Sequence, residues 1–435
     1  MLNRAKTMCR AAVTLVVLLA ISPLAWPATQ PPASDLEYRQ RARQEFTIFD
    51  HSYAHSRAER VKQVRALGKQ VFARETAGQP SECSHQILNE IAWYLGYTAD
   101  FKAVDRRLAD LQNTLAHAEM EAKAAEQDPA DGSWGACYTQ WFFKLDASFD
   151  HLRELTAKGE RPKYKPRFLD RINSPEKLRA YLTAVSISDI ADSGVDHRRE
   201  FNESLADLLR LILDGAPKGY RLDRGLRPTM MKLIREDFRN PATAWWGERY
   251  ARDGKLEFVD DISITFHVVR YLNGDVPELA KVGETALAVK DLDYHVGWLE
   301  DGQYTNHNNM DAVVLFKYSW PYLDPERKRD LTAEIRKMLD WCLRESLQAD
   351  GSFKLEPDDQ DSAEEQTYFG VAFLSRVGFF DKSARFWTTE NFVQAPEVMQ
   401  GIRSYIVQHQ RSGGAGGEYY RNALKLLEPG AHRDP

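Results

Sequence analysis

The stretch DPERKRDLTAEIRKMLDWCLRESL at residues 324–347 decides the fold class of this chain of 435 residues. Asp324 is a favoured helix N-cap, and Pro325 suits the first helical position. The apolar residues behind them recur three or four positions apart, along one face of a helix. These residues are Leu331, Ile335, Met338, Leu339 and Cys342. The stretch therefore predicts an amphipathic helix that buries one face.

Similar patterns elsewhere predict a protein built from helices. One helix opens at residues 174–176, and another is marked by Ile262, Phe266 and Val269. Strand signals are weak, because we find no series of alternating runs joined by Asn-Gly or Asp-Gly turns. Helical hairpins must stack to bury their apolar faces, and no strict repeat of about 34 or 40 residues indicates a solenoid. We therefore predict an all-α fold, an incomplete or closed α/α toroid, with a helical bundle as the alternative.

The first 28 residues have the pattern of a secretory signal. A basic start with Arg4, Lys6 and Arg10 precedes an apolar run at residues 11–25. That run is shorter than the roughly 20 residues that span a membrane. An uncleaved N-terminal anchor is the alternative. We expect a periplasmic or secreted protein with no stable membrane span after cleavage.

The rest of the chain divides at residues 158–167, a stretch rich in Lys and Pro that is typical of a linker or long loop. We expect an N-terminal helical region at 29–160 and a toroid region carrying a cleft at 161–428. The glycine-rich segment 412–417 is expected to be mobile, and the tail at 429–435 disordered.

The charge balance argues against nucleic acid as a partner. The chain has 58 Lys and Arg against 64 Asp and Glu, and loss of residues 1–28 would leave 55 against 64. An acidic chain binds nucleic acid poorly, and an anionic polymer would need a local basic groove. A glycan or another small-molecule ligand is the expected partner.

Cysteine and histidine patterns give no sign of a cofactor. Cys83 and Cys137 can pair in an oxidising compartment, which leaves one further cysteine alone. His267, His295 and His307 are too far apart for the HxxxH or HExxH spacing of zinc enzymes. No CxxC, GxSxG or glycine-rich phosphate loop occurs. We therefore predict no cofactor and no metal.

Two short segments place aromatic or acidic residues where a ligand site needs them. Trp245 and Trp246 point in different directions, so one is expected to face solvent and stack on a sugar ring. The alternative is that both wedge into the core. Arg249 follows as a candidate binding residue. Asp260 and Asp261 precede a helix, and capping needs only one of them, which leaves the other for acid–base work or ligand binding.

The segment at residues 293–311 is the richest in polar side chains. It holds two His, three Asn, four acids, one Trp and two Tyr. No apolar periodicity explains this content, so we expect it to line a site; a solvated loop held by Asx turns is the alternative. Asn308 or Asn309 is expected to cap a helix that begins near Met310. The candidate site residues here are His295, Trp298, Asp301, Asn306, His307, Asn308 and Asn309.

A later segment, residues 350–370, carries seven acids. Tyr368 is expected to begin the next helix and to lie near the rim of a cleft. The alternative is a solvated acidic loop before a helix N-terminus, where acids are favoured. The spacing of an EF-hand calcium loop is absent.

These last two segments together resemble the alginate-lyase type of α/α-toroid enzyme. NHNN at 306–309, DGSFKLE at 350–356 and then Tyr368 are similar to an Asn-Asn-His element, a DGSxxxE segment and a catalytic tyrosine in that family. The order here is Asn-His-Asn-Asn, and Met310 follows where the family has polar or aromatic character. The Asp-Gly-Ser motif also occurs in terpene-cyclase-like toroids, which share the ring of helical hairpins but not the chemistry.

The resemblance implies a polysaccharide lyase that cleaves a uronate-containing glycan by β-elimination. Asn306, Asn308 or Arg249 would neutralise the uronate carboxylate. His307 would take the proton next to the carboxyl group, because imidazole has an ordinary pKa of about 6.5. Tyr368 would protonate the leaving oxygen.

Two other functions remain open. A glycoside hydrolase needs two carboxyl groups, about 5–5.5 Å apart for retention or about 6.5–9.5 Å apart for inversion. Asp260 or Asp261 with Asp301, or Asp301 with Glu364, would supply them. A non-catalytic glycan-binding protein would use the tryptophan-rich loops without chemistry. We favour an enzyme.

Overall fold

The computed structural model describes residues 51–428 except 78, 124–125, 253, 356–362 and 410–416. The predicted signal segment, the predicted tail, most of the glycine-rich segment and the end of the DGSFKLE segment lie outside the described residues. Within the described ranges, no helix combines the length and the apolar character that crossing a membrane requires.

Helices make up most of the described chain, as predicted. The α-helices are α2 (His51–Thr76), α3 (Glu82–Tyr97), α4 (Phe101–Ala116), α5 (Trp141–Lys158), α6 (Pro175–Val185), α7 (Ile190–Ser193), α8 (Arg198–Asp214), α9 (Leu226–Lys232), α10 (Ile262–Tyr271), α11 (Leu279–Ala288), α12 (Asn306–Ser319), α13 (Pro325–Trp341), α14 (Ala363–Arg376), α15 (Ala395–His409) and α16 (Gly417–Leu426). Short 3-10 or π turns are η1 (Ala118–Lys123), η2 (Arg167–Arg171), η3 (Leu233–Asp237), η4 (Trp320–Tyr322), η5 (Cys342–Ser346) and η6 (Lys382–Ala384).

The helix predicted at 324–347 forms as α13, followed directly by η5. Asp324 caps it by accepting a hydrogen bond from the backbone N–H of Arg327 at 2.8 Å. All five apolar residues of the predicted face are buried. The same device opens α6, where the hydroxyl of Ser174 accepts from the N–H of Lys177. These helices are confirmed because caps and apolar periodicity act locally.

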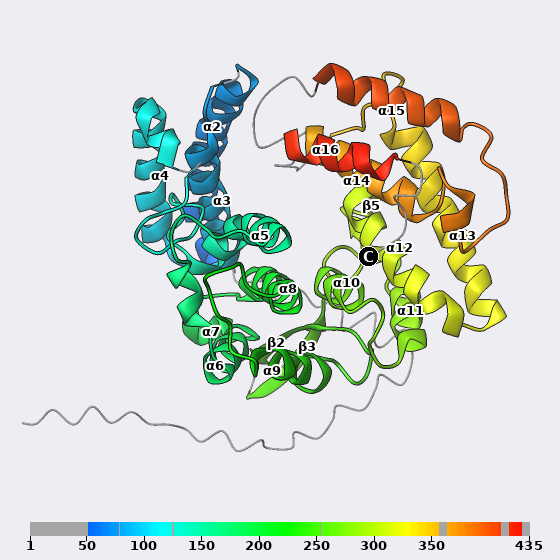
Figure 1. Cartoon of the computed structure of the whole chain (residues 1–435), viewed down its shortest axis with the longest axis horizontal. Coiled ribbons are helices and arrows are strands. Elements are labelled where there is room, and N and C mark those ends of the chain that lie inside the picture. The colour runs from blue at the N-terminus through cyan, green and yellow to red at the C-terminus, as the bar shows by residue number, and fades with distance from the viewer. Residues whose placement is uncertain are drawn as a thin grey trace, which may run out of the picture.

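The helices form a curved row, in which α5, α8, α10, α12, α14 and α16 pack each on the next (Figure 1). Helices α6 and α9 pack on α8, and α11 and α13 pack on α12. In Figure 1 these four lie away from the centre of the arc. The row therefore has a concave side, to which side chains of several helices can turn.

Neighbouring helices of the row run in the same direction. At their starts, Arg198 of α8 pairs with Asp261, the N-cap of α10, at 2.7 Å. At their ends, the guanidinium of Arg210 lies 5.6 Å from the ring centroid of Tyr271. Two parallel helices in sequence need a returning segment between them, and α9 with the following strands supplies it.

Two small sheets accompany the helices, and the sequence analysis missed them. Strands β1 (Ile187–Ser188), β2 (Gly247–Arg252) and β3 (Lys255–Asp260) form one, with β1 parallel and β3 antiparallel to β2. Strands β4 (Leu299–Glu300) and β5 (Gln303–Tyr304) form the other. An Asp-Gly pair stands in each hairpin connection, at 253–254 and at 301–302, and such pairs are strong hairpin signals.

The described residues form two hydrophobic clusters. One packs between α2, α3, α4 and the first turn of α5, and the other extends from α5 to α16. Helix α5 contributes to both, since Phe142 and Phe143 belong to the first cluster and Leu145 and Leu152 to the second. The predicted division at residue 160 stays a prediction.

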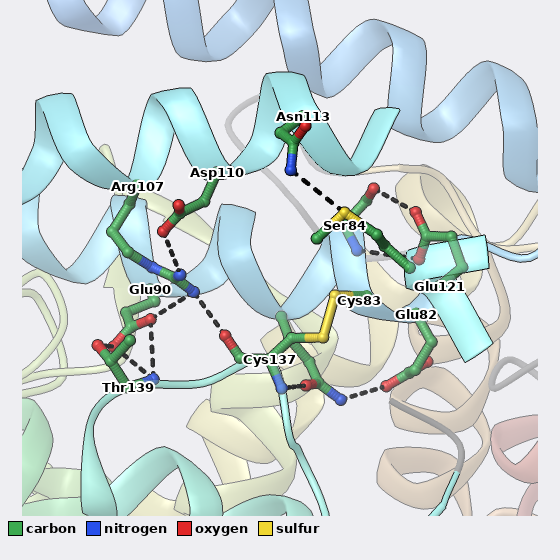
Figure 2. Close-up of a disulfide and its surroundings, with 12 residues drawn as sticks. Glu82, Cys83, Ser84, Glu90, Arg107, Asp110, Asn113, Glu121, Cys137 and Thr139 are labelled. Atoms are coloured by element: carbon green, nitrogen blue, oxygen red, sulfur yellow. Dashed lines mark hydrogen bonds and ion pairs between the residues drawn. A yellow bond between two sulfur atoms is a disulfide. The ribbon is translucent and has the colours of Figure 1, made fainter. Parts of the chain in front are cut away.

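A disulfide ties the first cluster together. Cys83 of α3 is bonded to Cys137, and the two Cα atoms are 5.4 Å apart. Figure 2 shows Arg107 of α4 beside it, paired with the buried Glu90 at 2.7 Å and donating to the carbonyl of Cys137 at 2.6 Å. These bonds hold the segment before α5 against α3 and α4. Cys342 is a buried free thiol, as the sequence predicted.

Candidate functional site

The three candidate tryptophans belong to the core. The expectation that Trp245 or Trp246 faces solvent is wrong, because both are fully buried. The indole N–H of Trp245 donates to the carbonyl of Val282 at 3.0 Å, and that of Trp246 to the carbonyl of Ile234 at 2.7 Å. Trp298 is also fully buried. None of these rings offers a face to a sugar.

The two acids before α10 both bind the scaffold. Asp261 accepts from the N–H of Ile264 at 3.1 Å and from Nε of Arg198 at 2.7 Å. Asp260 accepts from the side-chain amide of Asn240 at 2.9 Å. Both carboxyl groups are buried. Asp260, the acid that does not cap α10, is therefore also held by a hydrogen bond to the scaffold.

Asp301 and Glu364 also have local structural roles. Asp301 is exposed, and it and Gly302 have φ values of 48° and 73°. A type I′ hairpin turn requires positive φ at both central positions, and this turn joins β4 to β5. Glu364 lies in the first turn of α14, where the helix dipole favours acids.

Helix α12 begins at Asn306, earlier than predicted, so the whole NHNN segment is helix rather than loop. Its N-cap is Thr305, which accepts from the N–H of Asn308 at 3.1 Å, and not Asn308 or Asn309. The amide of Asn306 donates to Ser346 at 2.7 Å, and the amide of Asn308 donates to Glu300 at 3.1 Å. These two amides fix α12 to neighbouring segments.

The other predicted binding residues are partly or fully buried. Arg249 on β2 donates to the hydroxyl of Ser186 at 3.0 Å, and burial lowers its pKa. His295 is half-buried, and burial, followed by the charge of Arg198, lowers its pKa well below the usual value. Asn309 is fully buried, and its amide has no hydrogen-bond partner within the described ranges.

His307 and Tyr368 come from distant parts of the sequence to neighbouring helices. The imidazole of His307 on α12 stacks on the ring of Phe369 on α14, with 3.8 Å between centroids and 13° between planes. The ring of Tyr368 lies 5.2 Å from that of Phe369. Tyr368 is in the second turn of α14, which begins at Ala363 rather than at the tyrosine. Burial lowers the pKa of His307 to about 4, so its imidazole is neutral at pH 7.

Two arginines that the sequence analysis missed extend this group. Burial, followed by the charge of Arg270 on α10, lowers the pKa of Arg376 on α14 to about 10. Helix α12 packs between α10 and α14 in the row, and Arg270 is close enough to Arg376 for its charge to act on that guanidinium group. Burial, followed by the charges of Arg270 and His307, lowers the pKa of His267 to about 3. The sequence signal for Arg270 was its position one helical turn after His267, which places the two side chains on the same face of α10.

Tyr294, in the segment before β4, packs beside Arg198 of α8. The side chain of Tyr294 is 37% exposed, yet burial among protein atoms raises its pKa to about 12. The guanidinium of Arg198 lies 4.9 Å from the ring centroid of Tyr294. The segment before β4 thus lies against the start of α8.

In the part of the chain that the structure describes, no three His, Cys, Asp or Glu side chains are placed to hold a metal ion. Comparison of the chain with protein-family models, curated proteins and solved structures found no match.

Proposed function

We propose that this protein is an exported polysaccharide lyase that cleaves a uronate-containing glycan by β-elimination in an α/α toroid. The parallel neighbours in the row, with returning helices on its outer side, support the toroid. The observation that carries the reaction is one set of side chains linked by ring contacts and by the effect of charge on pKa. It consists of Arg270, His307, Tyr368 and Arg376, from three successive helices of the row.

The two guanidinium groups provide the place for the uronate carboxylate. Burial is the main cause of the lowered pKa of Arg376 and repulsion by Arg270 adds to it, so an anion between the two groups would relieve that repulsion. Neutralising the carboxylate is what makes the neighbouring carbanion accessible in β-elimination. In this proposal the arginines replace Asn306, Asn308 and Arg249, whose side chains hydrogen-bond to the scaffold.

His307 and Tyr368 supply the two proton transfers. Neutral His307 has a lone pair to take the proton next to the carboxyl group, and a carboxylate bound nearby raises the basicity of its ring. As that C–H bond breaks, a C=C bond forms and the glycosidic C–O bond breaks. The phenol of Tyr368 gives its proton to the departing oxygen. The proton held by His307 then returns to solvent, and the tyrosinate takes a proton back from solvent, so both side chains regain their starting forms.

The test is ultraviolet absorbance of the new C=C bond while the purified protein is offered a panel of uronate polymers. We expect absorbance to rise, and His307→Ala or Tyr368→Phe to slow the rise about a hundredfold or more. Tyr322→Phe, at an exposed tyrosine on η4, is the matched control and should leave the rate unchanged.

Reducing ends are measured in parallel on neutral glycans. Reducing ends without absorbance would replace the lyase by a hydrolase that uses paired carboxyl groups. A glycan that raises the melting temperature yet yields no product in either assay would make this a binding protein.

A further inference from the structure

A cavity of about 340 Å³ opens where α8 ends and α9 begins, and three exposed arginines line it. They are Arg221, Arg224 and Arg227. Apolar side chains of α8, α9 and the loop between them complete the lining: Ile212, Leu222 and Leu226. The volume lies at the lower end of the range of small-molecule sites. No lining residue belongs to α10, α12 or α14, so this cavity is separate from the group around His307.

The positive charge that lines the cavity is not neutralised within the protein. Among the residues that the structure describes, none of the three guanidinium groups has a hydrogen-bond or ion-pair partner. Asp223 is the one acid in the lining, and its Oδ1 already accepts from the backbone N–H of Gly225 at 2.6 Å. The lining therefore has three positive charges against one negative. Guanidinium groups in this state are suited to bidentate binding of carboxylates from outside.

A second basic segment lies beside the cavity. Residues 158–167, predicted above to be a linker or long loop, carry five Lys or Arg against one acid. The backbone N–H of Lys218 donates to the carbonyl of Glu160 at 3.2 Å, which joins this segment to the loop after α8. The Nζ atom of Lys165 lies 5.9 Å from the ring centroid of Tyr220, which lines the cavity. Such a local basic surface is what a chain of negative net charge needs to bind an anionic polymer.

We propose that this cavity is an accessory site that binds the carboxylate groups of an acidic glycan at a distance from the group around His307. Three guanidinium groups around one cavity fit a ligand with several carboxylates, and the apolar lining fits the C–H faces of sugar rings. That the anion is a glycan rests on the proposed function. A polymer held here stays at high effective concentration near the reacting group, so the site favours long chains over short ones.

Calorimetry with polygalacturonate and alginate on His307→Ala, in the full chain, tests the accessory site without turnover. Adding Arg221→Gln, Arg224→Gln and Arg227→Gln together should weaken binding at least tenfold, because charge-assisted contacts and the second point of attachment are lost. The matched control removes the same charge from scattered exposed positions, by changing to Gln Arg65, Arg329 and Arg344. It should leave the affinity unchanged. Both triple variants should keep the melting temperature, because all six side chains are exposed.

Two comparison ligands define what the cavity recognises. A neutral β-glucan should bind at least tenfold more weakly than the uronate polymer, and so should inorganic pyrophosphate, a small polyanion without sugar rings. Tighter binding of pyrophosphate than of either uronate polymer would overturn the glycan site. Absence of binding to both uronate polymers, or an equal loss of affinity in the two triple variants, would also overturn it.

Turnover separates this site from the proposed reaction. With His307 intact, the triple substitution in the cavity should raise KM for the polymer about fivefold or more and leave kcat within about twofold, because the reacting group is untouched. Elimination with an unchanged KM would overturn only the accessory site. Polymer binding that the triple substitution abolishes, without elimination of any uronate polymer by the wild type, would keep the site and overturn only the lyase.

Discussion

At His307 and His267, surroundings rather than residue type set the protonation state. Burial is the main cause that lowers the pKa of His307 to about 4 and that of His267 to about 3. A histidine with a lowered pKa takes up its proton more readily in the unfolded chain. Its contribution to stability is therefore complete above the ordinary pKa of about 6.5 and is lost as the pH falls towards 4.

The pH dependence of unfolding by urea tests whether this contribution to stability is lost as the pH falls. The free energy of unfolding of the wild type should fall between pH 7 and pH 4, with His307 alone responsible for on the order of 2 kcal/mol. His307→Asn should show a correspondingly smaller fall over the same range. Parallel curves for the two proteins would mean that the imidazole titrates normally.

Trp246 illustrates how a residue type that suggests a binding site can be structural. Its ring is fully buried and its N–H is bonded to the carbonyl of Ile234. Trp246→Ala should therefore destabilise the fold by about 3–5 kcal/mol, because it leaves a large cavity. Tyr322→Ala, at a side chain that is 64% exposed, should cost about 0.5 kcal/mol or less. Thermal or urea unfolding of the two variants compares them directly, and similar losses would contradict the assignment.

At the scale of the element, a buried ion pair holds α8 and α10 side by side. Arg198 and Asp261 are both buried, and Asp261 also caps α10. Asp261→Asn keeps a good capping residue but removes the charge that faces Arg198. We expect a loss of about 3–5 kcal/mol in the free energy of unfolding, because an unpaired buried charge remains.

Asp324→Asn is the matched control for that prediction. It also replaces a capping aspartate by asparagine, at a helix start where the carboxylate accepts from the N–H of Arg327. Its cost should be about 0.5 kcal/mol or less. If the two substitutions cost the same, the ion pair contributes nothing beyond the cap.

At the scale of the whole molecule, the disulfide stabilises one of the two hydrophobic clusters. Cys83 and Cys137 are 54 residues apart in sequence, and both border the cluster of α2, α3 and α4. Closing a loop of that length stabilises a fold by about 4 kcal/mol in the chain-entropy model. Reduction, or Cys83→Ser with Cys137→Ser, should therefore loosen this cluster first.

Hydrogen exchange resolves where the loosening occurs. Amides of α3 and α4 should exchange faster after reduction, while those of α10, α12 and α14 keep their rates. An equal acceleration in both sets would show that the two clusters unfold as one cooperative unit.

The individual helices could be predicted from the sequence, and the small strands could have been. Residues 324–347 and 174–176 carry caps and apolar periodicity, which depend on neighbours within a few positions. The Asp-Gly pairs at 253–254 and 301–302 were equally local signals of hairpins and were overlooked. The start of α12 was placed too late, because Thr305 is a weaker capping signal than the asparagines that follow it.

The site could be predicted only in part, since its residues are brought together by helix packing. His307 and Tyr368 were named from a resemblance, and the stack of His307 on Phe369 places them on adjacent helices. Arg270 and Arg376 were missed because nothing in the sequence states that residues of α10 and α14 come close in space.

The sequence by itself determined the helical class, the capped helix starts and the apolar faces, because hydrogen bonding and hydrophobic periodicity operate over one or two turns. Only the tertiary structure decided which polar residues share a surface. Trp245 and Trp246 proved to be core residues, and the packing of α10, α12 and α14 brought Arg270 close enough to Arg376 for its charge to act there. The physical reason is that packing of apolar faces sets the direction of each helix, and that direction sets where its polar side chains meet.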